Sequence, residues 1–361
     1  MAQFPVDPLI HRASTLPAAF YTDPQHFNDS LEKIFCKPWQ FAGDEHLVQF
    51  PYDVFPFTLL EGSLNEPLLL TRNENDGIMC LSNVCTHRAN LVVDNPGKKK
   101  KLVCGYHGRR FSLDGKFEHM PEFKETENFP EACDDLAQIP LYRWRQFLFV
   151  NLNPAFDFHK VTDTMEEKIG FMPVEKFWYS PERSKSHIVN AHWALYCDNY
   201  LEGFHIPFVH PDLNNALEYN SYQTILYSYS NLQVGYSKDS TEIFDLPEGH
   251  TDHGKHVAAY YFWIFPNMMF NFYPWGLSLN IVNPISKDTC NVSFLTYVYD
   301  ESKVDGSAGA LLNKVEKEDE YVVESVQKGL RSRFYKRGRF SPTREQGVHH
   351  FHLLLSSFFD A

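Results

Sequence analysis

Short apolar runs alternate with turn-forming segments between about residues 39 and 155. Four of these runs read "FTLL", "LLLTR", "IMCLSNV" and "QFLFVNL", and they are separated by stretches such as "EGSLNEP", "NENDG" and "NPGKK". Apolar runs of this length, bounded by Gly, Pro and Asn, are typical of strands in an antiparallel sheet. We therefore predict a small antiparallel β domain over residues 39–155.

The segments on either side of this region have a different pattern. Before it, Asp23 or Pro24 opens a short amphipathic helix that runs to Phe35. After it, a helical pattern around 190–205 precedes three aromatic strand regions and two helices. The strand regions are 222–235, 257–273 and 277–298, and the helices lie near 308–330 and 347–358.

Strands that precede helices without β-α-β alternation indicate an α+β protein. We expect three segments. Residues 1–38 pack on the C-terminal domain, 39–155 form the small β domain, and 156–361 form a larger domain whose antiparallel sheet is covered by helices.

Composition limits the partners and the compartment. The 361 residues carry a net charge of −13, which argues against nucleic acid or an anionic membrane as a partner. No apolar run approaches the ~20 residues of a membrane span, and the N-terminus has no signal-peptide pattern. The seven cysteines lack disulfide-like spacing. We expect a cytoplasmic protein.

Two cysteines and two histidines are spaced as a four-ligand metal site. "VCTHRAN" contains Cys85 and His87, and "CGYHGRRF", sixteen residues further on, contains Cys104 and His107. Each loop supplies one thiolate and one imidazole, whereas zinc fingers usually place two cysteines together and two histidines together. In a Rieske [2Fe–2S] centre one iron takes both thiolates and the other both imidazoles. The pattern favours a Rieske cluster, with structural zinc as the alternative.

Glycines and lysines accompany this motif. Gly105 and Gly108 flank the second ligand pair, where a residue without a side chain lets the backbone approach a cluster closely. The run Lys98 to Lys101 lies between the two loops, on a predicted hairpin. It is either a solvated turn or a basic docking point for an acidic electron donor.

A second set of histidines occurs in "DNYLEGFHIPFVH". His205 and His210 are five residues apart and do not share one helical face, but Pro207 must end or kink a helix and can bring the two rings together. Glu202 shares the helical face of His205. Such a pair can be purely structural, but a one-electron cluster upstream needs an acceptor. We predict that the pair binds a metal.

The third ligand of a 2-His-1-carboxylate site must come from elsewhere. The helix "LLNKVEKEDEYVVESVQKGL" should bury an apolar stripe of Leu312, Val315, Val322, Val323, Val326 and Leu330. Asp319 falls near the middle of this stripe, while its glutamates fall toward the edges. A buried carboxylate needs a partner such as a metal. Asp319 is therefore the predicted ligand, with Glu316 in reserve.

The chain resembles the Rieske non-haem iron oxygenases over nearly its whole length, through both histidine motifs, "EDEYVVESVQKGL" and the tail "GRFSPTREQGVHHFH". The resemblance implies mononuclear Fe(II) at the two histidines and the aspartate. It also implies that Glu202 bridges this site to a Rieske histidine of a neighbouring subunit, that Asn199 lies near the iron, and that the protein is a trimer. The chain departs from the family at Arg109, usually Trp, and at Ala89, usually Gly.

Other motifs restrict the electron source. The chain contains no G-x-G-x-x-G or Walker motif, so electrons should come from a separate reductase or ferredoxin. The histidines of "GHTDHGKH" (His250, His253 and His256) are expected in a solvent loop. Those of "HHFH" (His349, His350 and His352) are expected to pack or face solvent rather than bind metal.

The substrate is the least constrained feature. The resemblance implies O2 and a small organic substrate, and within the family the chain is most similar to the branch that oxidises choline and other quaternary ammonium compounds. A quaternary ammonium is best held by aromatic faces. Trp263, Phe265, Phe270, Phe272, Tyr273 and Trp275 could form such a cage, or could be the core face of a sheet. An aromatic-ring (di)oxygenase is the alternative, and a Rieske electron carrier or a zinc-stabilised binding protein is more remote.

Overall fold

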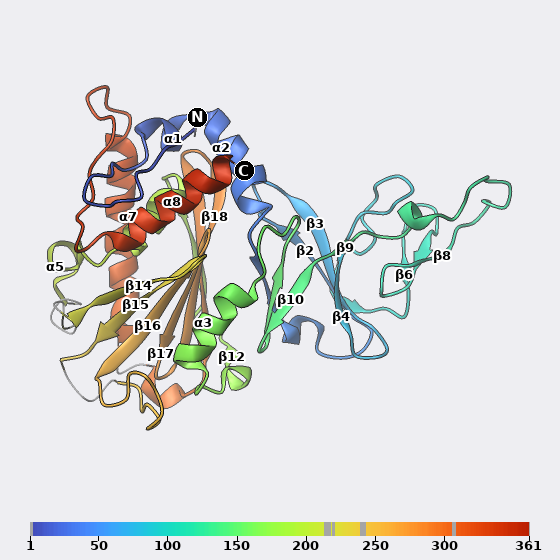
Figure 1. Cartoon of the computed structure of the whole chain (residues 1–361). Coiled ribbons are helices and arrows are strands. Elements are labelled where there is room, and N and C mark those ends of the chain that lie inside the picture. Colours follow the sequence, from blue (N-terminus) through green and yellow to red (C-terminus); the bar gives the residue numbers. More distant parts are fainter. Residues whose placement is uncertain (1–2, 213–217, 219–220, 239–242, 305–307, 361) are drawn as a thin grey trace. The chain divides into compact units, whose positions relative to one another are not determined.

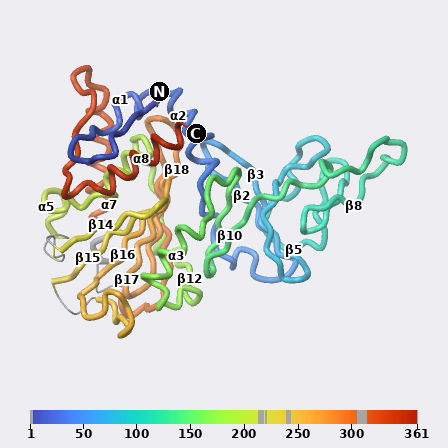
Figure 2. Tube along the Cα trace, viewed as in Figure 1, coloured from blue at the N-terminus to red at the C-terminus, as the bar shows by residue number. Residues whose placement is uncertain are grey.

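Two units make up the chain, and the course of each can be followed in Figures 1 and 2. The structure is a computed structural model that describes residues 3–212, 218, 221–238, 243–304 and 308–360, with the side chains of 308–313 excepted. One unit consists of Trp39–Ala155, and in the other Met1–Pro38 join Phe156–Ala361.

The unit of residues 39–155 contains three small antiparallel sheets, with strand orders β1-β11-β10, β5-β2-β3-β4-β9 and β6-β7-β8. The strands are β1 (Gln40–Asp44), β2 (Asp53–Leu59), β3 (Glu66–Arg72), β4 (Ile78–Ser82), β5 (Gly97–Lys98), β6 (Leu102–Val103), β7 (Arg110–Phe111), β8 (Phe117–His119), β9 (Gln138–Ile139), β10 (Leu141–Trp144) and β11 (Phe147–Val150), with 3₁₀ turns η2 (Glu45–Val48) and η3 (Ala132–Asp134). Side chains of the second and third sheets share one core with Cys85 and Cys104.

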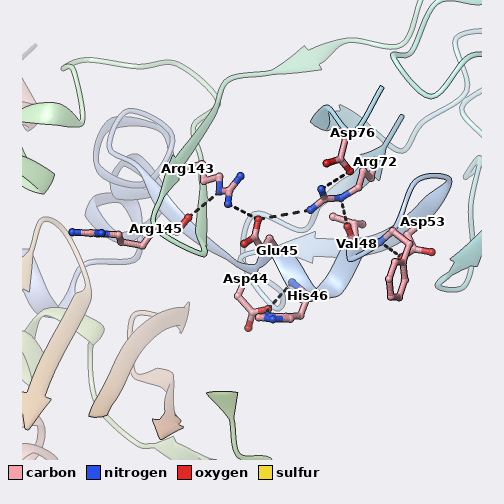
Figure 3. A network of polar contacts seen from close by, with 10 residues as sticks. Asp44, Glu45, His46, Val48, Asp53, Arg72, Asp76, Arg143 and Arg145 are labelled. Atoms are coloured by element: carbon pink, nitrogen blue, oxygen red, sulfur yellow. Dashed lines mark hydrogen bonds and ion pairs between the residues drawn. The ribbon is translucent and has the colours of Figure 1, made fainter. Parts of the chain in front are cut away.

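Arg72 at the end of β3 anchors this unit with a buried guanidinium (Figure 3). Its Nε donates to the Val48 carbonyl at 2.6 Å and its Nη1 to Asp76 Oδ1 at 2.8 Å. Its Nη2 lies 3.7 Å from Glu45 Oε2, and that oxygen pairs with Arg143 Nη2 at 2.7 Å. A buried charge is costly unless it is paired in this way. The network therefore ties β3 and β10 to the turn η2.

The lysine run does not lie on a hairpin, contrary to the prediction. β5 pairs with β2 instead of β6, so the run passes from the second sheet to the third. Lys98 and Lys101 form ion pairs with neighbouring carboxylates. Lys99 and Lys100 are exposed.

The other unit is built on one eight-stranded antiparallel sheet with the order β12-β19-β18-β17-β16-β15-β14, in which β13 also pairs with β19. Its strands are β12 (Trp178–Tyr179), β13 (Lys185–Val189), β14 (Gln223–Leu226), β15 (Ser230–Tyr236), β16 (Val257–Ile264), β17 (Met268–Tyr273), β18 (Gly276–Ser286) and β19 (Thr289–Val298). Each of the three predicted aromatic regions corresponds to two of these strands, because short turns divide them.

Helices cover both faces of this sheet (Figure 1). They are α1 (Ala18–Thr22), α2 (Pro24–Ser30), α3 (His159–Ile169), α4 (Trp193–Tyr200), α5 (Ile206–Val209), α7 (Ala308–Gly329) and α8 (Gln346–Asp360), with the short turns η1 (Leu31–Phe35), η4 (Val174–Lys176) and η6 (Glu301–Lys303). On one face, Lys168 of α3 and Tyr260 of β16 both bond to Asp252. On the other, Trp263 of β16 packs against Phe351 of α8, with ring centroids 5.1 Å apart. The α+β prediction is confirmed.

The N-terminal helix begins as predicted. The Asp23 carboxylate accepts a hydrogen bond from the Gln25 N–H at 2.8 Å, which caps α2, and Pro24 is its first residue. The last turn before Cys36 is η1, a π-helical turn whose backbone bonds span five residues.

The apolar stripe of α7 is narrower than predicted. Val323 and Leu330 are buried, but Val326 is 43% exposed, so its predicted burial is wrong. The side chain of Leu312 lies outside the described residues. No helix in the described part of the chain combines the length and hydrophobicity needed to span a bilayer.

Candidate iron and iron–sulfur sites

His205 and His210 flank a single helical turn. α4 ends at Tyr200, so Glu202 and His205 do not share a helix as predicted, and Pro207 lies inside α5. A proline is tolerated there because first-turn N–H groups have no helical partner. His205 precedes α5 and His210 follows it, so one turn places both rings on the same side, with centroids 5.0 Å apart.

Asp319 of α7 reaches the same point from a distant part of the chain. Its Oδ1 lies 3.0 Å from His210 Nε2 and 3.4 Å from His205 Nε2. Metal–ligand bonds of about 2.1 Å at right angles would place neighbouring ligand atoms about 3 Å apart. The three residues therefore fit a 2-His-1-carboxylate site. The reserve candidate, Glu316, instead pairs with Lys185.

A carboxylate holds each histidine from its other ring nitrogen. His205 Nδ1 lies 2.7 Å from Glu202 Oε1, and His210 Nδ1 lies 2.7 Å from Glu318 Oε2. Metal-binding histidines characteristically donate their second N–H to such a partner, which fixes the tautomer and the ring orientation. The sequence did not single out Glu318, because helical periodicity places it off the apolar stripe. Its position next to Asp319 was the available signal.

Charge around these imidazoles favours a cation. Burial alone would lower the pKa of His205, but hydrogen bonds with Asp319 and Glu202 outweigh burial and raise the pKa to about 9. Burial also opposes the rise in the pKa of His210, which Asp319 and Glu318 cause. The pKa of Asp319 is lowered, because the two histidines outweigh its burial. A metal ion would compete with protons for the same nitrogen atoms.

A cavity opens onto the three converging residues. It is lined by the aromatic residues Tyr196, Tyr200, Tyr222, Tyr261, Tyr273 and Phe294, by the carboxylates Glu202, Glu316 and Asp319, and by amides that include Asn199. Tyr196 and Tyr200 lie four residues apart on α4, a spacing that puts both on one helical face. None of the described lining residues is Lys or Arg. The undescribed segments contain neither residue type.

Of the two alternatives for the aromatic residues between Trp263 and Trp275, the core of the sheet agrees with the structure better than a substrate cage. Only Tyr273 of the six candidates is among the described residues that line the cavity. Phe270 and Phe272 alternate with Asn271 and Tyr273 along β17, so they project from the opposite face of the sheet. The cavity instead meets a row of directly opposed residues on four strands. That row consists of Gln233, Tyr261, Asn271 and Ser278.

The four predicted cluster ligands lie close together in the other unit. Cys85 and Cys104 are each 2% exposed, whereas His107 is exposed and His87 half-buried. The centroids of the two imidazole rings are 4.8 Å apart. Asn90 Nδ2 donates toward Cys104 Sγ at 3.7 Å. Paired thiols inside and paired imidazoles toward solvent fit the two-sided ligation of a Rieske cluster.

Both ligand loops close with the same turn. The Ala89 N–H donates to the Cys85 carbonyl at 2.9 Å, and the Gly108 N–H donates to the Cys104 carbonyl at 3.1 Å. Both residues have positive φ, 54° for Ala89 and 73° for Gly108. Gly adopts this conformation freely, whereas for Ala it costs of order 1–3 kcal/mol. The first loop therefore holds strain that the second avoids.

Comparison with known families covers both sites. Residues 39–130 match the Rieske [2Fe-2S] domain, and residues 177–359, half of the chain, match the ring hydroxylating alpha subunit (catalytic domain). The chain belongs to the Rieske non-haem iron oxygenases. Its cofactors are therefore a Rieske [2Fe–2S] cluster and a mononuclear iron, as predicted. The catalytic-domain match excludes a pure electron carrier and a zinc-stabilised binding protein.

Two groups of relatives resemble this oxygenase over most of their length. Choline monooxygenase of Beta vulgaris, a chloroplastic protein, is 31% identical over 95% of this chain and 76% of its own. The carnitine monooxygenase oxygenase subunit of Escherichia coli K12 is 28% identical over 96% of this chain and 94% of its own.

Solved structures share the fold. The quaternary ammonium Rieske monooxygenase CntA superposes with a TM-score of 0.81 at 22% identity, covering 99% of this chain and 100% of that chain. Naphthalene 1,2-dioxygenase from Rhodococcus superposes with a TM-score of 0.74 at 17% identity, covering 96% and 94%.

Two further histidine clusters of this oxygenase have polar contacts of their own within the protein. The loop of "GHTDHGKH" is not simply solvated as predicted, because Asp252 is buried and pairs with Lys168 at 3.0 Å and with Lys255 at 2.7 Å. In α8, His352 is 1% exposed and its Nε2 lies 2.9 Å from Asp198 Oδ1. For His352, this contact agrees with packing, one of the two predicted alternatives.

Proposed function

We propose that this oxygenase hydroxylates a small quaternary ammonium compound. The lining of the cavity carries the proposal. It combines aromatic rings with carboxylates, and its described residues include neither Lys nor Arg. A permanent cation is stabilised by ring faces and by nearby negative charge, whereas a neutral ring gains nothing from the carboxylates. The names of the choline and carnitine monooxygenases support the same substrate class.

In this proposal His205, His210 and Asp319 hold the iron, which supplies O2 activation, and Cys85, His87, Cys104 and His107 hold the cluster, which supplies single electrons. The tyrosines position the substrate. Burial raises the pKa of Tyr200 and Tyr222 well above the usual value, so both remain neutral phenols. The Tyr200 hydroxyl donates to Asn271 Oδ1 at 2.6 Å, which fixes its ring at the cavity wall. Asn199 also lines this cavity, which supports its proposed place near the iron.

A substrate comparison tests this proposal. Purified enzyme with a reductase would receive choline, carnitine or naphthalene, and O2 uptake would be measured together with product formation by mass spectrometry. We expect coupled turnover with a quaternary ammonium compound and none with naphthalene. Coupled oxidation of naphthalene alone would replace the proposal with an aromatic-ring (di)oxygenase. Labelling with ¹⁸O2 would show whether one or two oxygen atoms enter the product.

We further propose a homotrimer in which Glu202 passes electrons between subunits. Large apolar side chains near Glu202 are exposed, including Phe204 at 42%, Phe208 at 77% and Tyr321 at 77%. Such a patch marks an interaction surface. Tyr106, beside His107, is also 57% exposed. A structure of the quaternary ammonium Rieske monooxygenase CntA, described as giving insights into inter-subunit electron transfer, supports the arrangement.

Mixed subunits test the electron route. A Cys104→Ser chain lacks a cluster ligand and a His210→Ala chain lacks an iron ligand, so each alone should be inactive. Co-assembled chains should regain activity, because the cluster of one subunit can serve the iron of the next. Inactivity of the mixture in an assembly with confirmed metal contents would contradict transfer between subunits. Mass measurement in solution should give three times the 42.1 kDa of one chain.

Residues 39–155 are the proposed Rieske domain and 156–361 the proposed iron domain, on which 1–38 pack. We propose a separate reductase or ferredoxin as the electron donor and the cytoplasm as the compartment, since cysteines without disulfide spacing suit a reducing environment. Cell fractionation with detection of the native protein tests the compartment, and recovery in a membrane or extracellular fraction would contradict it.

A further inference from the structure

Arg109 is a buried cation beside the iron–sulfur ligands. It follows His107 by two residues, is 2% exposed, and its backbone carbonyl accepts a hydrogen bond from the Cys104 N–H at 2.9 Å. Its guanidinium lies among three aromatic rings, at 4.9 to 5.7 Å from the centroids of Phe117, Phe129 and Phe111. Burying a guanidinium costs free energy unless it is paired, so its partner must be well placed.

That partner is Asp134, the last residue of η3. Arg109 Nη2 donates to Asp134 Oδ1 at 2.6 Å and to the Asp134 carbonyl at 3.1 Å. The second carboxylate oxygen, Oδ2, accepts from the Glu131 N–H at 2.8 Å, which fixes the orientation of the carboxylate. The arginine is therefore held at two points by a residue that is itself held in place.

The same carbonyl also reaches the first ligand loop. The Thr86 hydroxyl, between Cys85 and His87, donates to the Asp134 carbonyl at 2.8 Å. One residue of η3 therefore contacts the loop of the first ligand pair through Thr86 and the loop of the second through Arg109. The two loops come from separate turns, and Asp134 links them from outside the ligand set.

We propose that Thr86, Asp134 and Arg109 form a clasp that joins the two ligand loops, and that the buried guanidinium of Arg109 raises the reduction potential of the cluster. Arg109 is thus a positioning residue that acts through charge as well as through contact. The proposal concerns the Rieske unit alone and does not depend on the identity of the substrate.

The direction of the charge effect follows from burial. The Arg109 side chain is 2% exposed and the Asp134 side chain 17%, so the positive end of the pair is less screened by water. Reduction adds one electron to the cluster and no bond changes. A nearby positive charge stabilises the more negative reduced form.

Two substitutions separate the charge effect from a purely structural role. Arg109→Met keeps the aliphatic stem but removes the positive charge, so it should lower the potential. Asp134→Asn keeps the carbonyl and one side-chain oxygen acceptor but removes the negative charge, so it should raise the potential. A structural role alone gives no reason for shifts of opposite sign. Arg110→Met removes the neighbouring, more exposed arginine and is the matched control.

The experiment is an anaerobic dithionite titration of the full-length, cluster-loaded protein, followed by visible circular dichroism and low-temperature EPR. For Arg109→Met we expect about a tenfold smaller equilibrium constant for reduction, which for one electron is about 59 mV. Asp134→Asn should shift in the opposite direction, and Arg110→Met should match the wild type. Thr86→Val should leave the potential nearly unchanged but release iron faster to a chelator.

Two outcomes would contradict the proposed effect of charge on the reduction potential. One is a shift of the same sign in Arg109→Met and Asp134→Asn, and the other is an unchanged potential in either variant when its cluster is fully loaded. If Arg109→Met does not bind a cluster, two other variants test whether charge sets the reduction potential. They are Arg109→Lys, which keeps the positive charge, and Asp134→Asn, which removes the negative charge. Iron release from Thr86→Val at the wild-type rate would overturn the clasp.

Discussion

The two candidate metal sites are assembled in opposite ways. In the unit of residues 39–155, all four proposed ligands lie on two neighbouring loops, with a similar turn in each. In the other unit, Asp319 comes from 109 residues beyond His210 and meets it only because α7 packs beside α4. The cluster ligands therefore come from two loops that are near each other in sequence, whereas the iron site also needs a ligand from a distant helix.

The surroundings of the sites also differ in charge. A buried arginine lies beside the cluster ligands, and carboxylates surround the iron ligands. The first arrangement favours a reduced, more negative centre, and the second favours a bound cation. The difference in assembly and the difference in charge between the two sites can both be tested by substituting one side chain at a time.

The largest effect should come from removing one ligand at each site. We expect His210→Ala to lose the mononuclear iron and all activity but to keep the visible spectrum of the cluster, because its unit does not contribute cluster ligands. Cys104→Ser should lose the spectrum and keep the single iron. Iron analysis together with visible spectroscopy checks both variants. Loss of colour in His210→Ala would mean that the two sites are misassigned.

The next largest effect concerns stability of the unit built on the large sheet. Asp252→Asn leaves the Lys168 ammonium buried without its counter-charge, which should cost about 3–5 kcal/mol of unfolding free energy. Lys255→Met, which keeps the buried pair and removes the 47% exposed partner, should cost less than about 1 kcal/mol. Denaturant unfolding followed by circular dichroism measures both. Equal losses of unfolding free energy in the two variants would show that the buried ion pair between Lys168 and Asp252 contributes no more to stability than the exposed one.

This pair should also make stability depend on acid. Burial alone would raise the pKa of Asp252, but hydrogen bonds from Lys255 and Lys168 outweigh burial and lower it to about 2. A lowered pKa stabilises the folded state above the unfolded value of 3.8 and loses that contribution as the pH falls toward 2. The difference between wild type and Asp252→Asn should therefore shrink over this interval, and a difference that stays constant would contradict the assignment.

An intermediate effect should distinguish the two carboxylates behind the histidines. Glu202→Gln should lower turnover by about 10–100-fold with both metals retained, because the proposed electron bridge is removed. Glu318→Gln, at the equivalent contact on His210, should mainly weaken iron binding. Single-turnover kinetics and iron titration check the pair. Equal iron loss in both variants would assign Glu202 to metal positioning alone.

The smallest effect should come from the exposed lysines of the Rieske unit. Reversal of Lys99 and Lys100 to Glu should lower kcat/KM for an acidic electron donor several-fold at low salt, and the difference should disappear at high salt. Steady-state reduction at two ionic strengths measures it. An unchanged rate at low salt would leave the run as a solvated crossing between sheets.

Local chemistry explains which predictions agree with the structure. Three predicted features depend only on residues that are near one another in sequence, and the structure contains all three. They are the pairing of thiols and imidazoles in two loops, the helix cap at Asp23 and the two long C-terminal helices. Asp319 could be predicted as a ligand from the sequence, because a carboxylate is unusual within the apolar stripe of a helix. Glu318 was missed because helical periodicity places it off that stripe, and only the fold shows its contact with His210.

Sequence by itself predicted the α+β class from apolar periodicity and favoured a Rieske cluster from the types and spacing of its ligands, because both features are encoded locally. The family and the mononuclear iron were predicted from the resemblance of the motifs to known oxygenases. Tertiary structure alone decided which aromatic residues line the cavity. Strand register selects one of every two side chains for each face, and the pairing of Gln233, Tyr261, Asn271 and Ser278 put these four on the cavity side. It also decided that Asp134 joins the two cluster loops, since that contact depends on how a distant turn folds back over them.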